Sequence, residues 1–184
     1  MLSRLNHGTY IMKSTSTHSS TSAPRLKGEY TITLHTRFAQ ALFLGDWKRK
    51  RMGLLQFAEQ LKQIYQSNSL NEAATQIQLA AINHELEAAE RQLQTWRHHY
   101  EQLLQRHPNI QLGLVKNDEP TIFPLRLGTP EAFKGAYLIA AVDNLVRILL
   151  TLENVGLLLV TTRNTLYVSI TDIVKKIFTD AYKI

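Results

Sequence analysis

The feature that most constrains the fold is a heptad pattern between residues 75 and 103. Its positions recur with spacings that alternate between four and three residues: Thr75, Leu79, Ile82, Leu86, Ala89, Leu93, Trp96, Tyr100 and Leu103. Such spacing predicts one long α-helix that buries a narrow seam against a partner helix. From Ser69 to His107, at about 1.5 Å per residue, this helix would be about 55 Å long. Its partner could lie in the same chain or in a second copy.

Two short segments alternate between apolar and polar side chains, which predicts half-buried β-strands. In the first segment, Tyr30, Ile32 and Leu34 face one side, and the other side carries Thr31, Thr33, His35 and Arg37. In the second, Phe123, Leu125 and Leu127 alternate with Pro124 and Arg126. Because proline has no backbone donor, the second strand is expected at a sheet edge or as an irregular strand.

Helical spacing of apolar residues predicts three more helices, at residues 53–66, 130–152 and 165–181. The middle one has a strong start signal, with Thr129 as the capping residue and Pro130 at the first helical position. It is apolar over most of its surface, so it is expected to be the central core helix. Asp143 and Arg147 are four residues apart on it, and this spacing predicts a mutual ion pair.

The composition fits one globular domain, with 184 residues of which 44% are hydrophobic. The expected fold is mostly α with short β-strands. Residues 1–27, which include a Ser/Thr-rich tract, are expected to be a flexible tail, and residues 28–184 a single domain. The uninterrupted apolar runs, such as residues 155–160, are far shorter than the roughly 20 residues that cross a bilayer. Without cysteine or a signal-peptide pattern, the chain is expected to be cytoplasmic, with no membrane partner.

Positive charge is concentrated near the N-terminus. The first 51 residues hold nine of the 21 Lys and Arg residues but only two of the 15 acidic residues, a formal charge of +7. The remaining residues carry 12 basic against 13 acidic side chains. Such asymmetry indicates an anionic partner, most often nucleic acid, although a terminal charge cluster can also serve solubility alone.

Signals for catalysis are weak. The eight glycines form no phosphate-binding pattern, and the adjacent His98 and His99 would point about 100° apart on a helix, which is poor geometry for one metal ion. The sequence holds no clustered carboxylates and no nucleophile–base pair. We therefore expect a protein that is not an enzyme and that needs no metal or other cofactor.

The first strand has the composition of a DNA-reading surface. Its polar face carries Thr31, Thr33, His35 and Arg37, side chains able to contact base edges in the major groove. Nearby cations are expected to contact phosphates: Arg25, Lys27, Lys48, Arg49, Lys50 and Arg51. Arg126 would do so if the second strand were the reading element instead. Threonine-rich faces are also common on exposed strands, so the strand alone does not decide between these interpretations.

Several short blocks resemble the AcaB family of regulators, which conjugative plasmids and integrating conjugative elements carry. The run Leu34-His-Thr-Arg-Phe-Ala39 is similar to that family's LHTRYA signature. The run Pro124-Leu-Arg-Leu-Gly-Thr-Pro130 and the later blocks Ala136-Tyr-Leu138, Asp143-Asn-Leu-Val-Arg147 and Val155-Gly-Leu157 also resemble the family pattern, in the same order. The resemblance covers about residues 28 to 180.

This resemblance implies a ribbon-helix-helix-like core, here elaborated with a long heptad helix, in a DNA-binding regulator of conjugative-transfer genes. In that architecture two antiparallel strands, usually from two subunits, enter the major groove while helices form the dimer core. We therefore expect double-stranded DNA as the partner and a homodimer, or a tetramer, held by Ile32, Leu34, Leu86, Leu93 and Trp96. The alternative is a helical assembly protein of the transfer apparatus that does not bind DNA.

Overall fold

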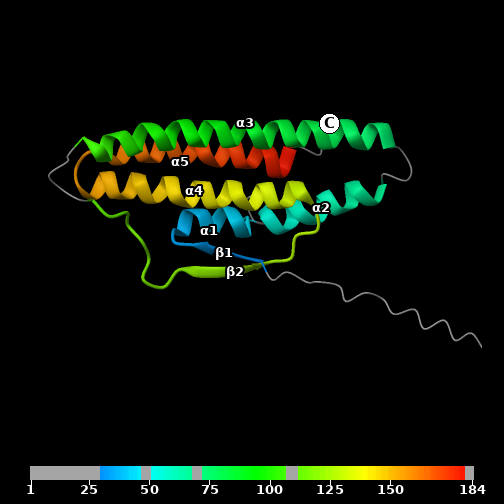
Figure 1. The fold of residues 1–184 in the computed structure, drawn as a ribbon, viewed down its shortest axis with the longest axis horizontal. Helices are drawn as coiled ribbons and strands as arrows, with labels where there is room; N and C mark the ends of the chain where they lie inside the picture. Colours follow the sequence, from blue (N-terminus) through cyan, green and yellow to red (C-terminus); the bar gives the residue numbers. More distant parts are fainter. Residues whose placement is uncertain (1–29, 47–50, 68–71, 107–111, 181–184) are drawn as a thin grey trace, which may run out of the picture.

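The computed structural model describes residues 30–46, 51–67, 72–106 and 112–180. In chain order its elements are β1 (Tyr30–Leu34), α1 (Arg37–Leu44), α2 (Leu54–Ser67), α3 (Glu72–Gln105), β2 (Thr121–Leu125), α4 (Pro130–Asn154), α5 (Val160–Lys175) and the π-helical turn η1 (Lys176–Asp180). Figure 1 shows α3 and α5 in one layer, α4 beside them, α1 and α2 next, and the two strands at the outer edge. The expected mostly α fold with short strands is confirmed.

The heptad seam of α3 packs inside the chain. Its apolar positions are buried, and α4 lies along it as the main partner (Figure 1). Leu79, Ile82 and Leu86 are each less than a tenth exposed. Of the two arrangements that the sequence allowed for this helix, the structure has the one within a single chain. The seam is therefore part of the core.

Helix α4 is the central element, as its apolar surface predicts. It contacts α1, α2, α3, α5 and β1, and most of its side chains are buried. By length and composition it could cross a bilayer, but 67% of its most apolar stretch is buried against the rest of the chain. This burial is what a core helix of a globular domain requires. Its predicted start is confirmed, because the Thr129 hydroxyl accepts a hydrogen bond from the Ala132 amide.

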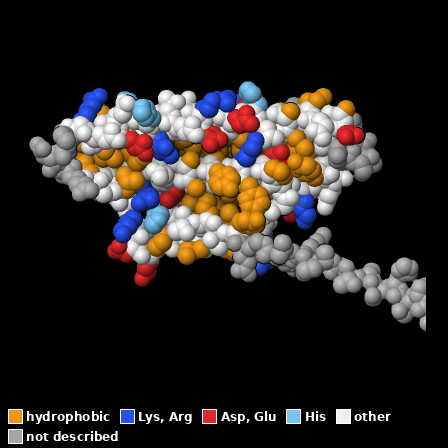
Figure 2. Space-filling view, viewed as in Figure 1, with side chains coloured by type: hydrophobic (Ala, Val, Ile, Leu, Met, Phe, Trp, Pro, Cys, Tyr) orange, Lys and Arg blue, Asp and Glu red, His pale blue; other side chains and the backbone are white. Residues whose placement is uncertain are grey.

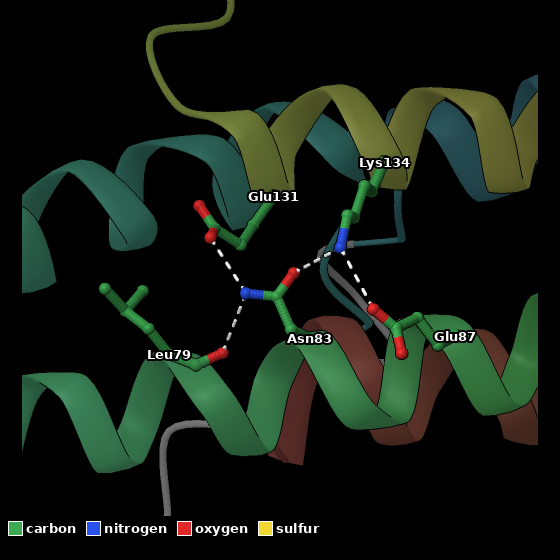
Figure 3. A network of polar contacts seen from close by, with 5 residues as sticks. All are labelled: Leu79, Asn83, Glu87, Glu131 and Lys134. Atoms are coloured by element: carbon green, nitrogen blue, oxygen red, sulfur yellow. Dashed lines mark hydrogen bonds and ion pairs between the residues drawn. The ribbon is translucent and has the colours of Figure 1, made fainter.

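A polar network fixes the first turn of α4 against α3 and α2 (Figure 3). The buried carboxylate of Glu131 accepts hydrogen bonds from Asn83 Nδ2 at 2.9 Å and from the Tyr65 hydroxyl at 3.0 Å. Desolvation by burial, and then the hydrogen bond to Glu131, raise the pKa of Tyr65 above its ordinary value, so this hydroxyl keeps its proton. Lys134 Nζ donates to Asn83 Oδ1 at 2.7 Å and lies 3.3 Å from Glu87. The network sets the register between α3 and α4.

Replacing Glu131 with Ala is expected to lower the free energy of unfolding by about 1–2 kcal/mol. The substitution leaves the Tyr65 hydroxyl and the Asn83 amide without their acceptor, and it removes a negative charge from the N-terminal turn of α4. Urea unfolding followed by circular dichroism measures the change. The exposed Glu90→Ala on α3 is the control, and equal midpoints for the two variants would contradict this role of the network.

The last helix begins earlier than predicted. Helix α5 starts at Val160 and not near Thr165, and the chain continues into η1. Its capping position is Leu159, whose side chain makes no capping hydrogen bond, so the sequence carries no start signal there. The predicted packing face is present, because Leu166, Ile170 and Val174 are buried.

Candidate nucleic-acid interface

The two predicted strands pair with each other as one antiparallel ribbon. Tyr30 lies opposite Leu125 and Leu34 lies opposite Thr121. The ribbon therefore comes from a single chain, although α1, α2 and α3 separate its two strands in the sequence. Each strand has one unpaired edge among the described residues, which accommodates Pro124 as its sequence requires.

The ribbon has one packed face and one exposed face. On the packed face, Ile32 and Leu34 are buried, and the ring of Phe123 stacks on Phe43 of α1 with centroids 4.3 Å apart. On the other face, Thr31 lies opposite Pro124 and Thr33 opposite Ile122, and all four are exposed. The exposed face thus presents hydroxyl and apolar groups that no part of the fold uses for packing. Figure 1 shows this ribbon at the outer edge of the molecule.

The junction from β1 to α1 is held by a buried carboxylate on α4. Asp143, which is 4% exposed, accepts hydrogen bonds from the Thr36 amide and the Thr36 hydroxyl, both at 2.8 Å. The amide of His35 donates to both oxygens of this carboxylate, at 3.1 and 3.2 Å. Thr36 is also the N-cap of α1, where its hydroxyl accepts from the Ala39 amide. A negative charge at a helix N-terminus is favourable, so Asp143 stabilises α1 as well as the turn before it.

This contact corrects the prediction for Asp143 and Arg147. The two side chains do not form the expected ion pair, because each has another partner. Arg147 Nε donates to the carbonyl of Val115 at 2.7 Å. The function of Asp143 and Thr36 was missed by sequence reasoning. One signal was present: a carboxylate within an apolar core helix needs donors from elsewhere in the fold.

The two predicted arginines lie at opposite ends of the ribbon. Arg126 directly follows β2, at the end where β1 begins, and Arg37 begins α1 just beyond the other end. Both side chains are exposed. The ribbon therefore carries a cation at each end, with Thr31 and Thr33 between them.

His35 differs from the other residues of its predicted face. It is half-buried, and its Nδ1 is buried without a hydrogen-bond partner. Only a part of this side chain is therefore available to a ligand of the ribbon.

The basic loop after α1 is closed at its base. Asp46 and Arg51 form an antiparallel bridge, and Arg51 Nη2 lies 3.4 Å from Asp46 Oδ2. The ends of this loop approach closely, because a Cβ on Gly53 would lie 2.3 Å from the carbonyl oxygen of Phe43. Arg51 is thus half-buried and already paired with an acid. The other predicted phosphate-binding residues, Arg25, Lys27, Lys48, Arg49 and Lys50, lie outside the described residues.

The residues predicted to hold a dimer are mostly core residues of one chain. The buried set is Ile32, Leu34, Leu86 and Leu93. Trp96 is partly exposed and packs against the same core. The first four side chains are covered by this chain's own elements, so in this conformation they offer no surface to a second copy. Among the described residues, no three His, Asp or Glu side chains gather where they could hold a metal ion.

The comparisons with known proteins agree on one family. The family model described as "Transcriptional regulator AcaB" matches residues 23–183. The crystal structure of selenomethionine-containing AcaB from uropathogenic E. coli has a similar fold, with a TM-score of 0.69 at 13% sequence identity. The alignment covers 84% of this chain and 76% of that one. A search of curated protein sequences finds no match.

Proposed function

This chain belongs to the AcaB family of transcriptional regulators, and we propose that it controls conjugative-transfer genes by inserting the β1–β2 ribbon into the major groove of DNA. Its partner is double-stranded DNA, and it acts in the cytoplasm without a cofactor. The base-reading side chains are Thr31 and Thr33, and Arg37 and Arg126 contact phosphates.

The observation that carries this proposal is the two-faced ribbon. Its inner face is packed on α1 and α4, and its outer face exposes Thr31, Thr33 and Ile122. Threonine hydroxyls hydrogen-bond to base edges, and apolar side chains contact the methyl group of thymine. Ile122 is 61% exposed, so its side chain is available for such a contact.

The dimensions of the ribbon also suit a groove. Five strand residues span about 17 Å, and the major groove is about 12 Å wide and admits a two-stranded ribbon. The exposed arginines at the two ends then lie where phosphates border the groove. Phosphate contacts position the ribbon, and the threonines between them supply specificity.

The double substitution Arg37→Gln and Arg126→Gln is expected to weaken DNA binding about 100-fold at 0.1 M salt. It should also reduce the slope of log K against log salt by about 1.8, because each lost phosphate contact removes about 0.9 from that slope. Gel retardation of DNA from upstream of the chain's own operon, across a salt series, measures both. The matched control is Lys62→Gln with Lys175→Gln, two exposed cations on α2 and α5. Equal losses in the two double variants would remove the arginines from the interface.

We further propose that the regulator is a homodimer, or a tetramer, whose contacts lie outside the heptad seam. An apolar hollow of about 260 Å³ lies beside β1; its lining includes Tyr30, Phe133 and Tyr137, and it borders the DNA-reading face at Thr31 and Thr33. Tyr30 and Tyr137 are 55% and 70% exposed, and Figure 2 shows apolar side chains gathered over α4 on this face. A contiguous exposed apolar patch supports an interaction surface. Light scattering after gel filtration measures the mass of the wild type and of Tyr137→Ser, and the variant should be the smaller species.

The alternative function is that of a helical assembly protein of the transfer apparatus. Exposed apolar side chains on α5 and the segment before it favour this reading, namely Leu157, Leu159, Val160 and Val168. Gel retardation of the full chain and of a chain lacking residues 1–27 separates the two functions. The assembly function predicts no retarded DNA with either chain. A deletion of residues 1–51 would be uninformative, because it removes β1 and α1 from the core.

A further inference from the structure

A second hollow lies at the junction of β1 and α1, on the side toward α5. Its volume is about 370 Å³, and its walls come from the β1–α1 junction, the segment before β2, and helices α4 and α5. The hollow is separate from the exposed face of the ribbon. Of the proposed DNA-contacting side chains that the structure describes, it shares His35 and Arg37.

The outer wall of this hollow is pinned in place. The segment before β2 has no regular secondary structure, but the amide of Val115 donates to the Thr151 hydroxyl at 2.9 Å. The carbonyl of the same residue accepts from Arg147 Nε at 2.7 Å. Both partners are on α4, so the wall is fixed to the most buried helix of the fold.

The charges on this lining have one sign. Arg37, in the β1–α1 junction, and Lys116, in the segment before β2, are both exposed, and no acidic residue is among the described residues of the lining. Asp118 and Glu119 follow Lys116 in the chain but do not line the hollow. By contrast, the neighbouring hollow at the end of α1 is lined by the paired Asp46 and Arg51, whose charges offset each other. The cationic lining is complementary to an anion.

The remaining lining offers an aromatic surface and a buried ring nitrogen. Phe38 and Tyr167 stack with centroids 4.2 Å apart, which provides a flat apolar wall. His35 also lines the hollow, and its buried Nδ1 has no hydrogen-bond partner in the described structure. That nitrogen is covered by the protein's own atoms, so a ligand in the hollow does not contact it in this conformation. A few polar groups at the edge of an apolar surface are the usual composition of a small-molecule site.

From this combination we propose that the hollow binds a small organic anion, in which an aromatic or apolar body carries one phosphate or carboxylate group. The body lies against Phe38 and Tyr167, and the acidic group lies between Arg37 and Lys116. The proposal concerns the free protein and does not depend on DNA binding.

The test is a titration of the full-length, ¹⁵N-labelled protein followed by NMR at the backbone amides of Lys116 and Asn117. Phenyl phosphate and benzoate are the two anionic probes, because each combines an aromatic ring with an acidic group. Two half-probes serve as controls: inorganic phosphate has the acidic group without the ring, and benzyl alcohol has the ring without the acidic group. At least one anionic probe should give saturable shifts, with a dissociation constant about tenfold or more below those of the half-probes. Whichever of phenyl phosphate and benzoate has the lower dissociation constant identifies the acidic group as phosphate or carboxylate.

Lys116→Gln is exposed and should fold normally, and it is expected to weaken that probe about fivefold without affecting benzyl alcohol. Lys175→Gln on α5 is the control for net charge and should leave the affinity unchanged. The proposal fails if no probe saturates, or if benzyl alcohol binds as tightly as the anions. It also fails if the two lysine variants lose affinity equally, since the site would then be only a diffuse positive surface.

Discussion

Replacing Asp143 with Ala is expected to lower the free energy of unfolding by about 3–4 kcal/mol, the largest effect of any single substitution considered. The change leaves three donors without an acceptor: the amides of His35 and Thr36 and the Thr36 hydroxyl. Two of the bonds are buried, so water cannot replace the carboxylate without opening the junction between β1 and α1. Urea unfolding at neutral pH measures the loss.

Two further variants show whether the loss arises at this junction. Asp172→Ala removes an exposed carboxylate from α5 and should change stability by less than about 0.5 kcal/mol. Thr36→Ala combined with Asp143→Ala should be less destabilising than the sum of the single variants, because both remove the same hydrogen bond. Strict additivity, or a stable Asp143→Ala protein, would contradict the role given to this carboxylate.

Replacing Lys48, Arg49 and Lys50 together with Gln is expected to weaken DNA binding by about 10² to 10³ at 0.1 M salt. Each phosphate contact contributes roughly a factor of ten at this salt concentration through the release of counterions. Arg51 is left in place, because it pairs with Asp46 at the base of the loop and its loss would also affect folding. Gel retardation across a salt series should show a slope reduced by about 2.7.

The matched control removes the same net charge from exposed positions on α2, just after α3 and on α5, as Lys62→Gln, Arg106→Gln and Lys175→Gln. If the loop only attracted DNA over a long range, both triple variants would lose the same modest amount of DNA affinity. That result would mean that the loop makes no direct contact with phosphate. A loss confined to specific DNA, with non-specific binding unchanged, would also contradict this assignment, because phosphate contacts act on every sequence.

The periodic features of the chain were predictable, and their partners were not. The spacing from Thr75 to Leu103 predicted α3, but a seam of this kind fits α4 and a second chain equally well. The alternation in both strands predicted which face of each is packed, but pairing between β1 and β2 depends on how the helices between them fold back. A periodic pattern carries information about one helix or strand, and it does not say which distant element that helix or strand contacts.

The single polar contacts were the least predictable part. Asp143 and Arg147 have the spacing of an ion pair, yet their partners lie more than 30 positions away in the chain. The His35 side chain alternates with Thr33 in the sequence, but the turn into α1 draws it partly into the fold. Family resemblance located the run from Leu34 to Ala39, and the structure gives this run a physical basis: a buried leucine, a helix cap held by Asp143, and a buried alanine.

The ribbon joins strands that are separated by α1, α2 and α3, and this has a consequence during synthesis. A nascent chain that has emerged only as far as α3 lacks β2 and therefore has no paired ribbon. Long-range pairing forms late, after the entropy of closing the intervening loop has been overcome. If the ribbon reads DNA as proposed, truncated or half-folded copies cannot occupy an operator, and only a completed molecule competes for it.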